Sequence, residues 1–378
     1  MTEPATDNER PQTSTRDPLD LQRRLQAWLA ERHQTGADPV VTGLRTPERN
    51  GMSSETVLFD LEATVDGRRS TAPYVARLAP ETSAVPVFPS YDFDKQFRVM
   101  RLVAAETSAP VPAAPWFEPD PGAVGSPFFV MERVEGEVPP DLMPYNFGDS
   151  WLFDATTEDQ ARLQEASVRV LAEIHTLDPD HADLAFVELD RPEPTALRRH
   201  VADQWDYYRW VSGDRPQPLI ERGFAWLEEH WPADEGPTVL SWGDSRIGNI
   251  LYRDFTPVAV LDWEMVGLAP REMDLAWMIF LHQFFEDLTS KLGLPGMPHF
   301  MRVADVATSY EAASGHEPRH LEFYLVYAAL RHGIVMSRVQ QRSIHFGEAE
   351  MPDDPDDLVM HRTVLEAMLD GSYWSTMA

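Results

Sequence analysis

Cysteine is absent from this chain of 378 residues. Its absence excludes a disulfide framework and any metal site built from thiolates. Lysine is almost absent too, since only Lys95 and Lys291 occur, so a pocket for an anionic ligand must rely mainly on arginine. No group of histidines has the spacing of metal ligands, which argues against a metal-dependent hydrolase of the zinc type.

Long apolar runs are missing as well. No uninterrupted stretch approaches the roughly 20 residues that a membrane-spanning helix needs, and the polar N-terminal segment lacks the apolar core of a signal peptide. We therefore expect a cytoplasmic protein without a membrane partner. Residues 1–17 are polar and mixed in charge, and we expect them to form a disordered leader.

Basic residues are outnumbered, with 32 Lys and Arg against 62 Asp and Glu, and the formal net charge is −30. This balance argues against nucleic acid as a partner, because its binding depends on basic contacts to phosphate. It favours a cationic substrate only if the acids gather at the substrate site, and a solvated acidic surface is the simpler interpretation. With 43% hydrophobic residues, the chain can bury a sizeable core, in two lobes.

The clearest chemistry lies in the stretch SWGDSRIGNILYRDFTPVAVLDWE, residues 241–264. Four residues separate Asp244 from Asn249, and a short apolar strand pattern then ends at Asp262. Magnesium prefers hard oxygen ligands and takes one or two carboxylates together with phosphate oxygens. Asn249 and Asp262 can supply such ligands from the two ends of a hairpin. Asp244 can then accept the proton of an attacking hydroxyl, which is the arrangement of phosphoryl transfer.

Taken alone, an Asp and an Asn at this spacing are also typical of ordinary solvated turns. The neighbouring residues favour the chemical interpretation. Gly243 and Gly248 permit a close backbone approach directly before Asp244 and Asn249.

The segment WGDSRIGNIL, followed by LDWEMVGLAPREMDLAW, resembles the aminoglycoside phosphotransferase family, relatives of the protein kinases. The resemblance covers roughly residues 40–335. It implies that Asp244 is the catalytic base, that Asn249 and Asp262 bind magnesium, and that Asp274 anchors the catalytic loop. One position departs from the pattern, because many members have a supporting His where this chain has Trp242.

The resemblance also implies an α+β, bilobal protein-kinase-like fold. A small β-rich N-terminal lobe, residues 18–133, would bind the nucleotide. A larger, mostly helical lobe, residues 134–378, would carry the catalytic residues and the acceptor substrate. Strand patterns at residues 40–44, 56–61 and 74–78 fit the small lobe.

Candidate contacts to ATP lie in three parts of the small lobe. The loop before the second strand offers Ser53 and Ser54. On its residues alone it is an ordinary hairpin turn, while the resemblance implies a cover over the nucleotide. Arg77 stands on the third strand, where the kinases carry a phosphate-binding lysine, and a solvent-facing arginine at a sheet edge is the alternative. A strand at residues 128–132 leads to the lobe connection, where the backbones of Glu132 and Val134 would bind adenine.

The main departure from the family concerns the ion pair of the small lobe. A glutamate on the next helix, predicted at residues 93–106, pairs with the strand cation in the family, but the aligned residue here is Gln96. Asp92, one turn earlier, is an alternative partner. In the large lobe we expect His175, at the end of a helix over residues 158–176, to brace the catalytic loop as a structural residue.

Three further segments of the large lobe read as helices. The aromatic residues within 195–231 have helical spacing and are expected in the core. Residues 323–335 form a strongly apolar helix pattern, and residues 358–369 form the last one.

We therefore predict an ATP- and Mg²⁺-dependent phosphotransferase that transfers the γ-phosphate to a hydroxyl of a small molecule. The acceptor would be aminoglycoside-like, or another alcohol such as a hydroxyacyl-CoA. The alternative is a nucleotide-binding protein of the same fold with little or no turnover, and its support is the pair of departures at Arg77 and Gln96.

Overall fold

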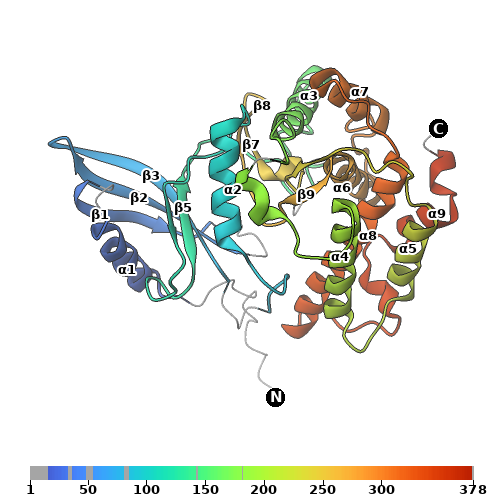
Figure 1. Ribbon diagram of the computed structural model, residues 1–378, viewed down its shortest axis with the longest axis horizontal. Coiled ribbons are helices and arrows are strands. Elements are labelled where there is room, and N and C mark those ends of the chain that lie inside the picture. The colour runs from blue at the N-terminus through green and yellow to red at the C-terminus, as the bar shows by residue number, and fades with distance from the viewer. Residues whose placement is uncertain are drawn as a thin grey trace, which may run out of the picture. The chain divides into compact units, whose positions relative to one another are not determined.

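The structure is a computed structural model that describes residues 16–32, 36–47, 54–80, 85–141, 144–180 and 182–376. The chain divides into two compact units (Figure 1). Unit 1 comprises Met1–Asp94, Ala114–Arg133 and Arg338–Met351, and unit 2 comprises Lys95–Ala113, Val134–Ser337 and Pro352–Ala378.

The chain enters unit 2 after Arg133, the position at which the sequence analysis divides the lobes into residues 18–133 and 134–378. Two segments differ from that division: most of the helix at 93–106 belongs to unit 2, and residues 338–351 return to unit 1. A division along the chain misses such returns, because they depend on contacts between distant segments. The expected leader lies outside the described residues, except for Arg16 and Asp17.

Unit 1 is built on a five-stranded antiparallel sheet with the order β1-β2-β3-β5-β4. Its strands are β1 (Ala37–Arg45), β2 (Glu55–Val65), β3 (Arg68–Leu78), β4 (Trp116–Glu118) and β5 (Phe128–Glu132). Buried and half-buried side chains alternate along β2, as expected for a strand with one face on a core.

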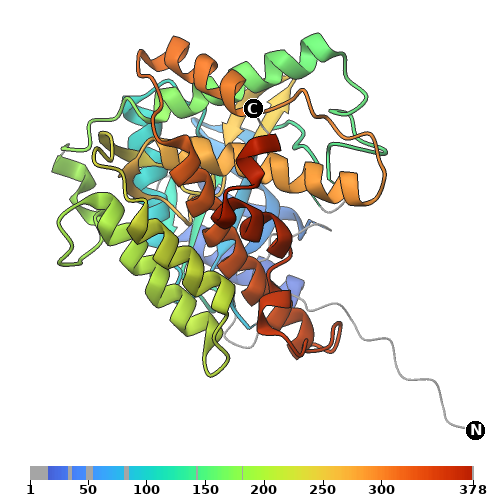
Figure 2. The same ribbon diagram turned by 90° about the vertical axis from the view of Figure 1, so that its right-hand side faces the viewer.

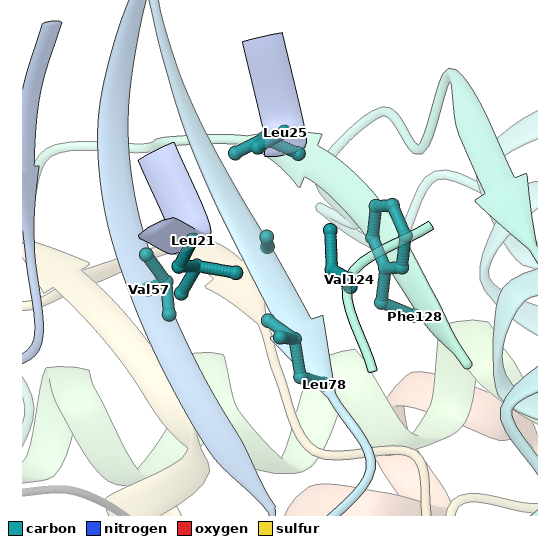
Figure 3. A pocket seen from close by; sticks show the side chains of 7 residues that line it. Leu21, Leu25, Val57, Leu78, Val124 and Phe128 are labelled. Atoms are coloured by element: carbon teal, nitrogen blue, oxygen red, sulfur yellow. The ribbon is translucent and has the colours of Figure 1, made fainter. Parts of the chain in front are cut away.

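Helix α1 (Pro18–Ala30) supplies the other side of that core. Its first turn is fixed by Asp17, whose side chain accepts a hydrogen bond from the backbone N–H of Leu19, and by Pro18 at the first helical position. Leu21 and Leu25 face strand residues including Phe128 across an apolar hollow (Figure 3). Only apolar side chains line this hollow, so we assign it to the core of unit 1 rather than to a ligand site.

Unit 2 is mostly helical. Its helices, including α2 and α8 that extend into unit 1, are α2 (Phe93–Glu106), α3 (Thr157–Ile174), α4 (Ala196–Ser212), α5 (Pro218–Glu229), α6 (Glu272–Lys291), α7 (Val303–Ser314), α8 (Leu321–His345) and α9 (Arg362–Asp370). Short 3₁₀ helices lie at Ala182–Val187, Ile247–Asn249, Pro355–Leu358 and Tyr373–Thr376.

Two small antiparallel sheets of unit 2 carry the candidate site. Strand β6 (Thr238–Ser241) pairs with β9 (Gly267–Pro270), and β7 (Ile250–Arg253) pairs with β8 (Thr256–Val260). Beside them, α4 and α5 run next to α8 in both views (Figures 1 and 2). Gly223 of α5 lies against Leu330 of α8 so closely that an added Cβ would come within 2.6 Å of the leucine side chain.

Most strongly patterned elements agree with the sequence analysis. Helix α2 and strand β5 have the predicted bounds. The last helix begins at Arg362 rather than at Leu358, because Asp354 caps a separate 3₁₀ turn by accepting a hydrogen bond from the N–H of Asp356. The aromatic residues of α4 are only partly core, since Trp205 and Trp210 stay 36% and 40% exposed.

Within the described ranges, no helix is both long and apolar enough to cross a membrane.

Candidate functional site

One buried carboxylate, that of Asp274 near the start of α6, holds the loop that follows β6. Its Oδ1 accepts hydrogen bonds from the hydroxyl of Ser241 and the N–H of Gly243, both at 2.9 Å. Its Oδ2 accepts one from the N–H of Trp242 at 2.8 Å and one from Nε2 of His175 at 3.0 Å. Three donors from the end of β6 and the following loop therefore fix that segment to α6, and His175 at the end of α3 is the fourth donor.

Burial alone would raise the pKa of Asp274. The hydrogen bond and charge of His175, together with the donors of the loop, outweigh that effect and lower the pKa below its usual value. Asp274 is therefore an ionised anchor. His175 is held from its other side by Tyr310, 2.8 Å from Nδ1, so it has the supporting role that the sequence predicts.

Gly243 is the point at which this loop passes another segment most closely. Its φ is +90°, and a Cβ built on it would lie 2.1 Å from the backbone oxygen of Met265. No other residue fits there without moving the backbone. The loop that carries Asp244 is thereby pressed against the segment that follows Asp262.

The carboxylate of Asp244 accepts three side-chain hydrogen bonds. Oδ2 accepts from Nδ2 of Asn249 at 2.7 Å and from Nε of Arg246 at 3.1 Å. Oδ1 accepts from Nε1 of Trp277 at 2.7 Å. The side chain stays 14% exposed, so it is fixed in orientation and still accessible.

Trp277 and Arg246 are contacts that the sequence analysis did not assign. Trp277 is the last residue of the motif LDWEMVGLAPREMDLAW and was given no role there, although its distance of three positions from Asp274 puts both on one face of α6. Arg246 also forms an ion pair with Asp141. Burial lowers the pKa of Arg246, but attraction to Asp244 and Asp141 more than offsets this and raises the pKa above its usual value.

Beside Arg246 lies a small hollow. Asp141, Tyr145 and Arg246 form its polar side, and Met278 and Phe285 belong to its apolar side.

Asn249 and Asp262 lie at the open end of the β7–β8 hairpin, as predicted. The N–H of Leu261 donates to the backbone oxygen of Asn249 at 2.9 Å, which joins the two segments directly. Asp262 follows with a φ of +58°, outside the extended range of the strand. Nε1 of Trp242 donates to the oxygens of Leu261 and Asp262, at 3.0 and 3.2 Å. The tryptophan that departs from the family pattern thus holds the turn at Asp262.

The donor set fits magnesium. The amide nitrogen of Asn249 is used by Asp244, so its oxygen is the part left to bind a cation. The carboxylate of Asp262 would add a second hard oxygen ligand. The described part of the chain holds no cluster of three or more His, Cys, Asp or Glu that could bind a metal. A site with one carboxylate and one amide suits Mg²⁺, which completes its shell with water and phosphate oxygens.

Unit 1 holds most of the residues predicted to contact the nucleotide. Ser54 is 2% exposed, and its hydroxyl has no hydrogen-bond partner among the described residues. Ser53 lies outside the described residues. Arg77 is on β3, between β2 and β5, and its Nη1 donates to Thr56 Oγ1 at 3.0 Å. The alternative of a sheet-edge arginine is therefore wrong, because β3 is an interior strand and Arg77 is half-buried.

The remaining predicted residues lie at the passage between the units or on α2. Glu132 is the exposed last residue of β5, and Val134 is the first residue of unit 2 after Arg133. Gln96 is buried in α2, whereas Asp92 is exposed just before that helix.

Solved structures share this fold. A candidate aminoglycoside phosphotransferase from Ralstonia eutropha aligns with a TM-score of 0.63 at 20% identity, covering 93% of this chain and 98% of the other. Plasmodium vivax ethanolamine kinase aligns with a TM-score of 0.57 at 14% identity, covering 88% and 84%. The predicted α+β, kinase-like fold is thereby confirmed.

The curated relatives are much longer than this chain. "Probable acyl-CoA dehydrogenase IBR3" of Arabidopsis thaliana is 24% identical over 316 residues, which cover 78% of this chain and 35% of the relative. Human acyl-CoA dehydrogenase family member 11 is 24% identical over 205 residues, covering 54% and 24%. The chain thus spans about a third or less of the length of these relatives.

The model of the phosphotransferase enzyme family (APH) matches residues 46–293, a span that includes β2, β3, the anchored loop and the β7–β8 hairpin. The chain belongs to this phosphotransferase enzyme family.

Proposed function

We propose that the chain transfers the γ-phosphoryl group of ATP to a hydroxyl of a small molecule, with Mg²⁺ as the metal. The observation that carries this proposal is the fixed position of the Asp244 carboxylate. It is hydrogen-bonded to Asn249, whose backbone is bonded in turn to the residue before Asp262. A proton acceptor and two cation ligands are thereby joined in one network within unit 2.

In the proposed reaction, Asp244 orients the acceptor hydroxyl and takes its proton. The hydroxyl oxygen forms a bond to the γ-phosphorus, the bond to the β–γ bridging oxygen breaks, and ADP leaves. Bound Mg²⁺ supplies positive charge that offsets the charge on the phosphate oxygens. Trp277 and Asn249 keep the carboxylate of Asp244 in one orientation throughout.

The nucleotide contacts remain those proposed from the sequence. Ser53 and Ser54 would donate to phosphate oxygens, and the unpaired buried hydroxyl of Ser54 supports this, because a buried hydroxyl without a partner costs stability. Arg77 would bind phosphate in place of a lysine. The backbones of Glu132 and Val134 would bind the adenine ring.

The acceptor class is part of the proposal. An aminoglycoside-like alcohol fits the names of several proteins whose solved structures share this fold. A hydroxyacyl-CoA fits the acyl-CoA names of the curated relatives, which belong to proteins about three or more times as long as the matched share. We place the reaction in the cytoplasm, with ATP and the acceptor as the only partners proposed.

A titration of ATP with and without Mg²⁺ tests the nucleotide and metal assignments. We expect ATP binding that strengthens with Mg²⁺, and Asp262→Asn should weaken the apparent Mg²⁺ affinity by at least about tenfold, the range seen even for residues that only support metal ligands. Asp254→Asn, at the opposite end of the same hairpin, is the matched control and should bind like the wild type.

Phosphate transfer is then screened with aminoglycosides, macrolides, choline-like alcohols and hydroxyacyl-CoA. Absence of ATP binding in the wild type would refute the assignments of Arg77, Asn249 and Asp262 together. Binding without transfer to any acceptor would favour the alternative, a nucleotide-binding protein of this fold.

Trp277→Phe is expected to lower kcat by about tenfold or more with little change in KM. The phenyl ring keeps an aromatic side chain in α6 and removes the N–H that donates to Asp244 at 2.7 Å, and a hydrogen bond to a charged group contributes about 1.5–3 kcal/mol. The loss of ring volume is matched in the control variant Trp263→Phe. Steady-state kinetics on the acceptor found in the screen would measure this.

Trp263→Phe is the control for Trp277→Phe. It removes a buried indole N–H that donates to the backbone oxygen of Val260 at 3.2 Å and does not contact Asp244. An equal loss of kcat in both variants would contradict a specific role for Trp277.

A further inference from the structure

Arg331, in the middle of α8, is buried, and no acceptor among the described residues bonds to it. Its side chain belongs to the largest fully buried ones in unit 2, and the residue is 2% exposed. Its Nε is completely enclosed and has no hydrogen-bond partner. No described residue forms an ion pair or a hydrogen bond with its guanidinium. Burying a charge in this way is costly unless a partner compensates for it.

Aromatic rings form the immediate surroundings of this guanidinium. Its central carbon lies 4.7 Å from the ring centroid of Trp277 and 5.8 Å from that of Tyr327. Such contacts favour a cation but leave its N–H groups without acceptors. Burial lowers the pKa of Arg331, and attraction to Tyr327, Asp274 and Asp244 opposes that effect.

Neither of the two nearby carboxylates forms a hydrogen bond or an ion pair with Arg331, and both are engaged with other donors. Asp274 accepts from four donors of the loop and α3, and Asp244 accepts from three other side chains. Arg246 provides the contrast within the same unit, since it pairs directly with Asp244 and Asp141. Arg331 therefore has donors that the described residues leave unused.

One more cation, Lys95, lies near Arg331, and a neutral histidine lies beside them. His200 lies 2.6 Å from the hydroxyl of Tyr327 through its Nδ1. Burial lowers the pKa of His200 well below its usual value, and the charges of Arg331 and Lys95 lower it further, so this ring is neutral. Lys95 is held in position by the backbone oxygen of Val266, at 3.0 Å. A chain with a net charge of −30 thus has a small positive cluster here, formed by Arg331 and Lys95.

Trp277 connects this cluster with the proposed chemistry. The indole N–H donates to Asp244, while the same ring is the one on which Arg331 stacks. Only one side chain therefore separates the guanidinium from the proposed catalytic base. A group bound by Arg331 would lie within the reach of a small acceptor whose hydroxyl is at Asp244.

We propose that Arg331, with Lys95 nearby, is a subsite for an oxyanion of the substrate, a carboxylate or a phosphate. The planar guanidinium matches such groups with paired hydrogen bonds. The preferred acceptor is then an alcohol that carries a negative charge, rather than a polycationic aminoglycoside. This inference rests on the proposed function for the acceptor, while the anion subsite itself can be tested without turnover.

The binding test uses sulfate as the probe and thermal unfolding as the readout, with Mg²⁺ and ADP saturating so that the nucleotide phosphates are in place. Sulfate is compared with chloride at equal ionic strength. We expect the wild type to gain a sulfate-specific rise in Tm, and Arg331→Met to lose it. Without sulfate, Arg331→Met should be as stable as the wild type or more stable, since it removes an uncompensated buried charge.

Arg342→Met, a second buried arginine of α8, is the matched control and should keep the sulfate effect. An equal sulfate-specific rise in wild type and Arg331→Met would overturn the subsite. A clearly destabilised Arg331→Met would instead indicate a structural arginine. If Arg331→Met does not fold, Arg331→Lys is tested instead. Lysine keeps the positive charge but lacks the planar guanidinium that forms paired hydrogen bonds, so this variant must show a reduced sulfate effect.

The activity test compares a hydroxy acid with its neutral methyl ester as phosphate acceptors, and with kanamycin. Arg331→Met should raise KM for the hydroxy acid by about 10- to 100-fold, as expected for lost hydrogen bonds to a charged group. Its kcat should stay within about threefold, and the ester should be unaffected. An equal loss with the ester would assign the oxyanion to the transferred phosphoryl group and overturn the anionic acceptor.

The two proposals fail in different ways. A sulfate effect that depends on Arg331, without transfer to any acceptor, would refute the proposed function and keep the anion subsite. Transfer to neutral and anionic alcohols alike, unchanged in Arg331→Met, would keep the function and refute the subsite.

Discussion

Replacing Asp244 by alanine is expected to lower kcat by a factor on the order of 10²–10⁴, the usual effect of losing a general base. The substitution removes the group that would accept the proton of the acceptor hydroxyl. It leaves Asn249 and Asp262 in place, so binding of Mg²⁺ and ATP should persist. The measurement is steady-state transfer of phosphate from ATP, together with a titration of ATP.

Asp244→Asn makes this test sharper, because the amide keeps the shape of the side chain and cannot take the proton. Asp254→Asn, on the exposed turn of the neighbouring hairpin, is the matched control for the same change of atoms. Turnover within about twofold of the wild type in Asp244→Ala would refute the assignment of the base. Loss of ATP binding together with turnover would indicate instead that Asp244 holds the site together.

We expect Asp244→Ala and Asp244→Asn to lower the free energy of unfolding only slightly, while kcat falls strongly. Asp244 remains partly exposed, so water can replace it as an acceptor for Arg246 and Trp277. Substitution of a catalytic carboxylate should therefore change mainly kcat, whereas substitution of an anchoring carboxylate should change mainly the free energy of unfolding.

The local sequence pattern was sufficient to predict those helices and strands whose structure depends mainly on their own residues. Helix α2 has an apolar face at helical spacing, and β5 is a short apolar run bounded by turn residues, so both were predicted to the residue. Strands β4 and β9 were not predicted. They are three and four residues long, and their pairing with β5 and β6 depends on residues brought together by the fold.

In the candidate site, too, the sequence predicted the residues of the motif but not the contacts that the fold brings together. The motif located Asp244, Asn249, Asp262 and Asp274, and the structure brings the first three into one hydrogen-bonded network with Asp274 beneath it. Their roles as base and metal ligands stay predictions. The motif gave no role to Trp277.

Arg331 was missed for a related reason. Its helix reads as strongly apolar from sequence, and one arginine within such a pattern is ordinarily taken to reach solvent. Its significance comes from the partners that it lacks, and only the positions of Trp277, Asp244 and Asp274 reveal that. A sequence shows which donors exist and cannot show which acceptors are already used.

Asp274→Asn is expected to lower the free energy of unfolding by about 3–5 kcal/mol, the cost of removing one partner from a buried charged network. The amide offers an N–H₂ group where the carboxylate accepts two hydrogen bonds, and the donors there lose their acceptor. These donors are either Ser241 and Gly243 at Oδ1 or Trp242 and His175 at Oδ2. Urea unfolding, followed by tryptophan fluorescence, measures the change.

Measurements on Asp274→Asn also decide whether Asp274 affects only the stability of the protein or its activity too. Gly243 cannot be displaced far, because the backbone oxygen of Met265 occupies the space beside it, so a loosened loop must shift Asp244 itself. We therefore expect the folded fraction of Asp274→Asn to lose kcat as well, with ATP binding reduced less. Asp305→Asn, an exposed aspartate paired with Arg302, is the control and should leave the urea midpoint unchanged. A wild-type midpoint in Asp274→Asn would show that the four hydrogen bonds are replaceable and that Asp244 is positioned by Asn249 and Trp277 alone.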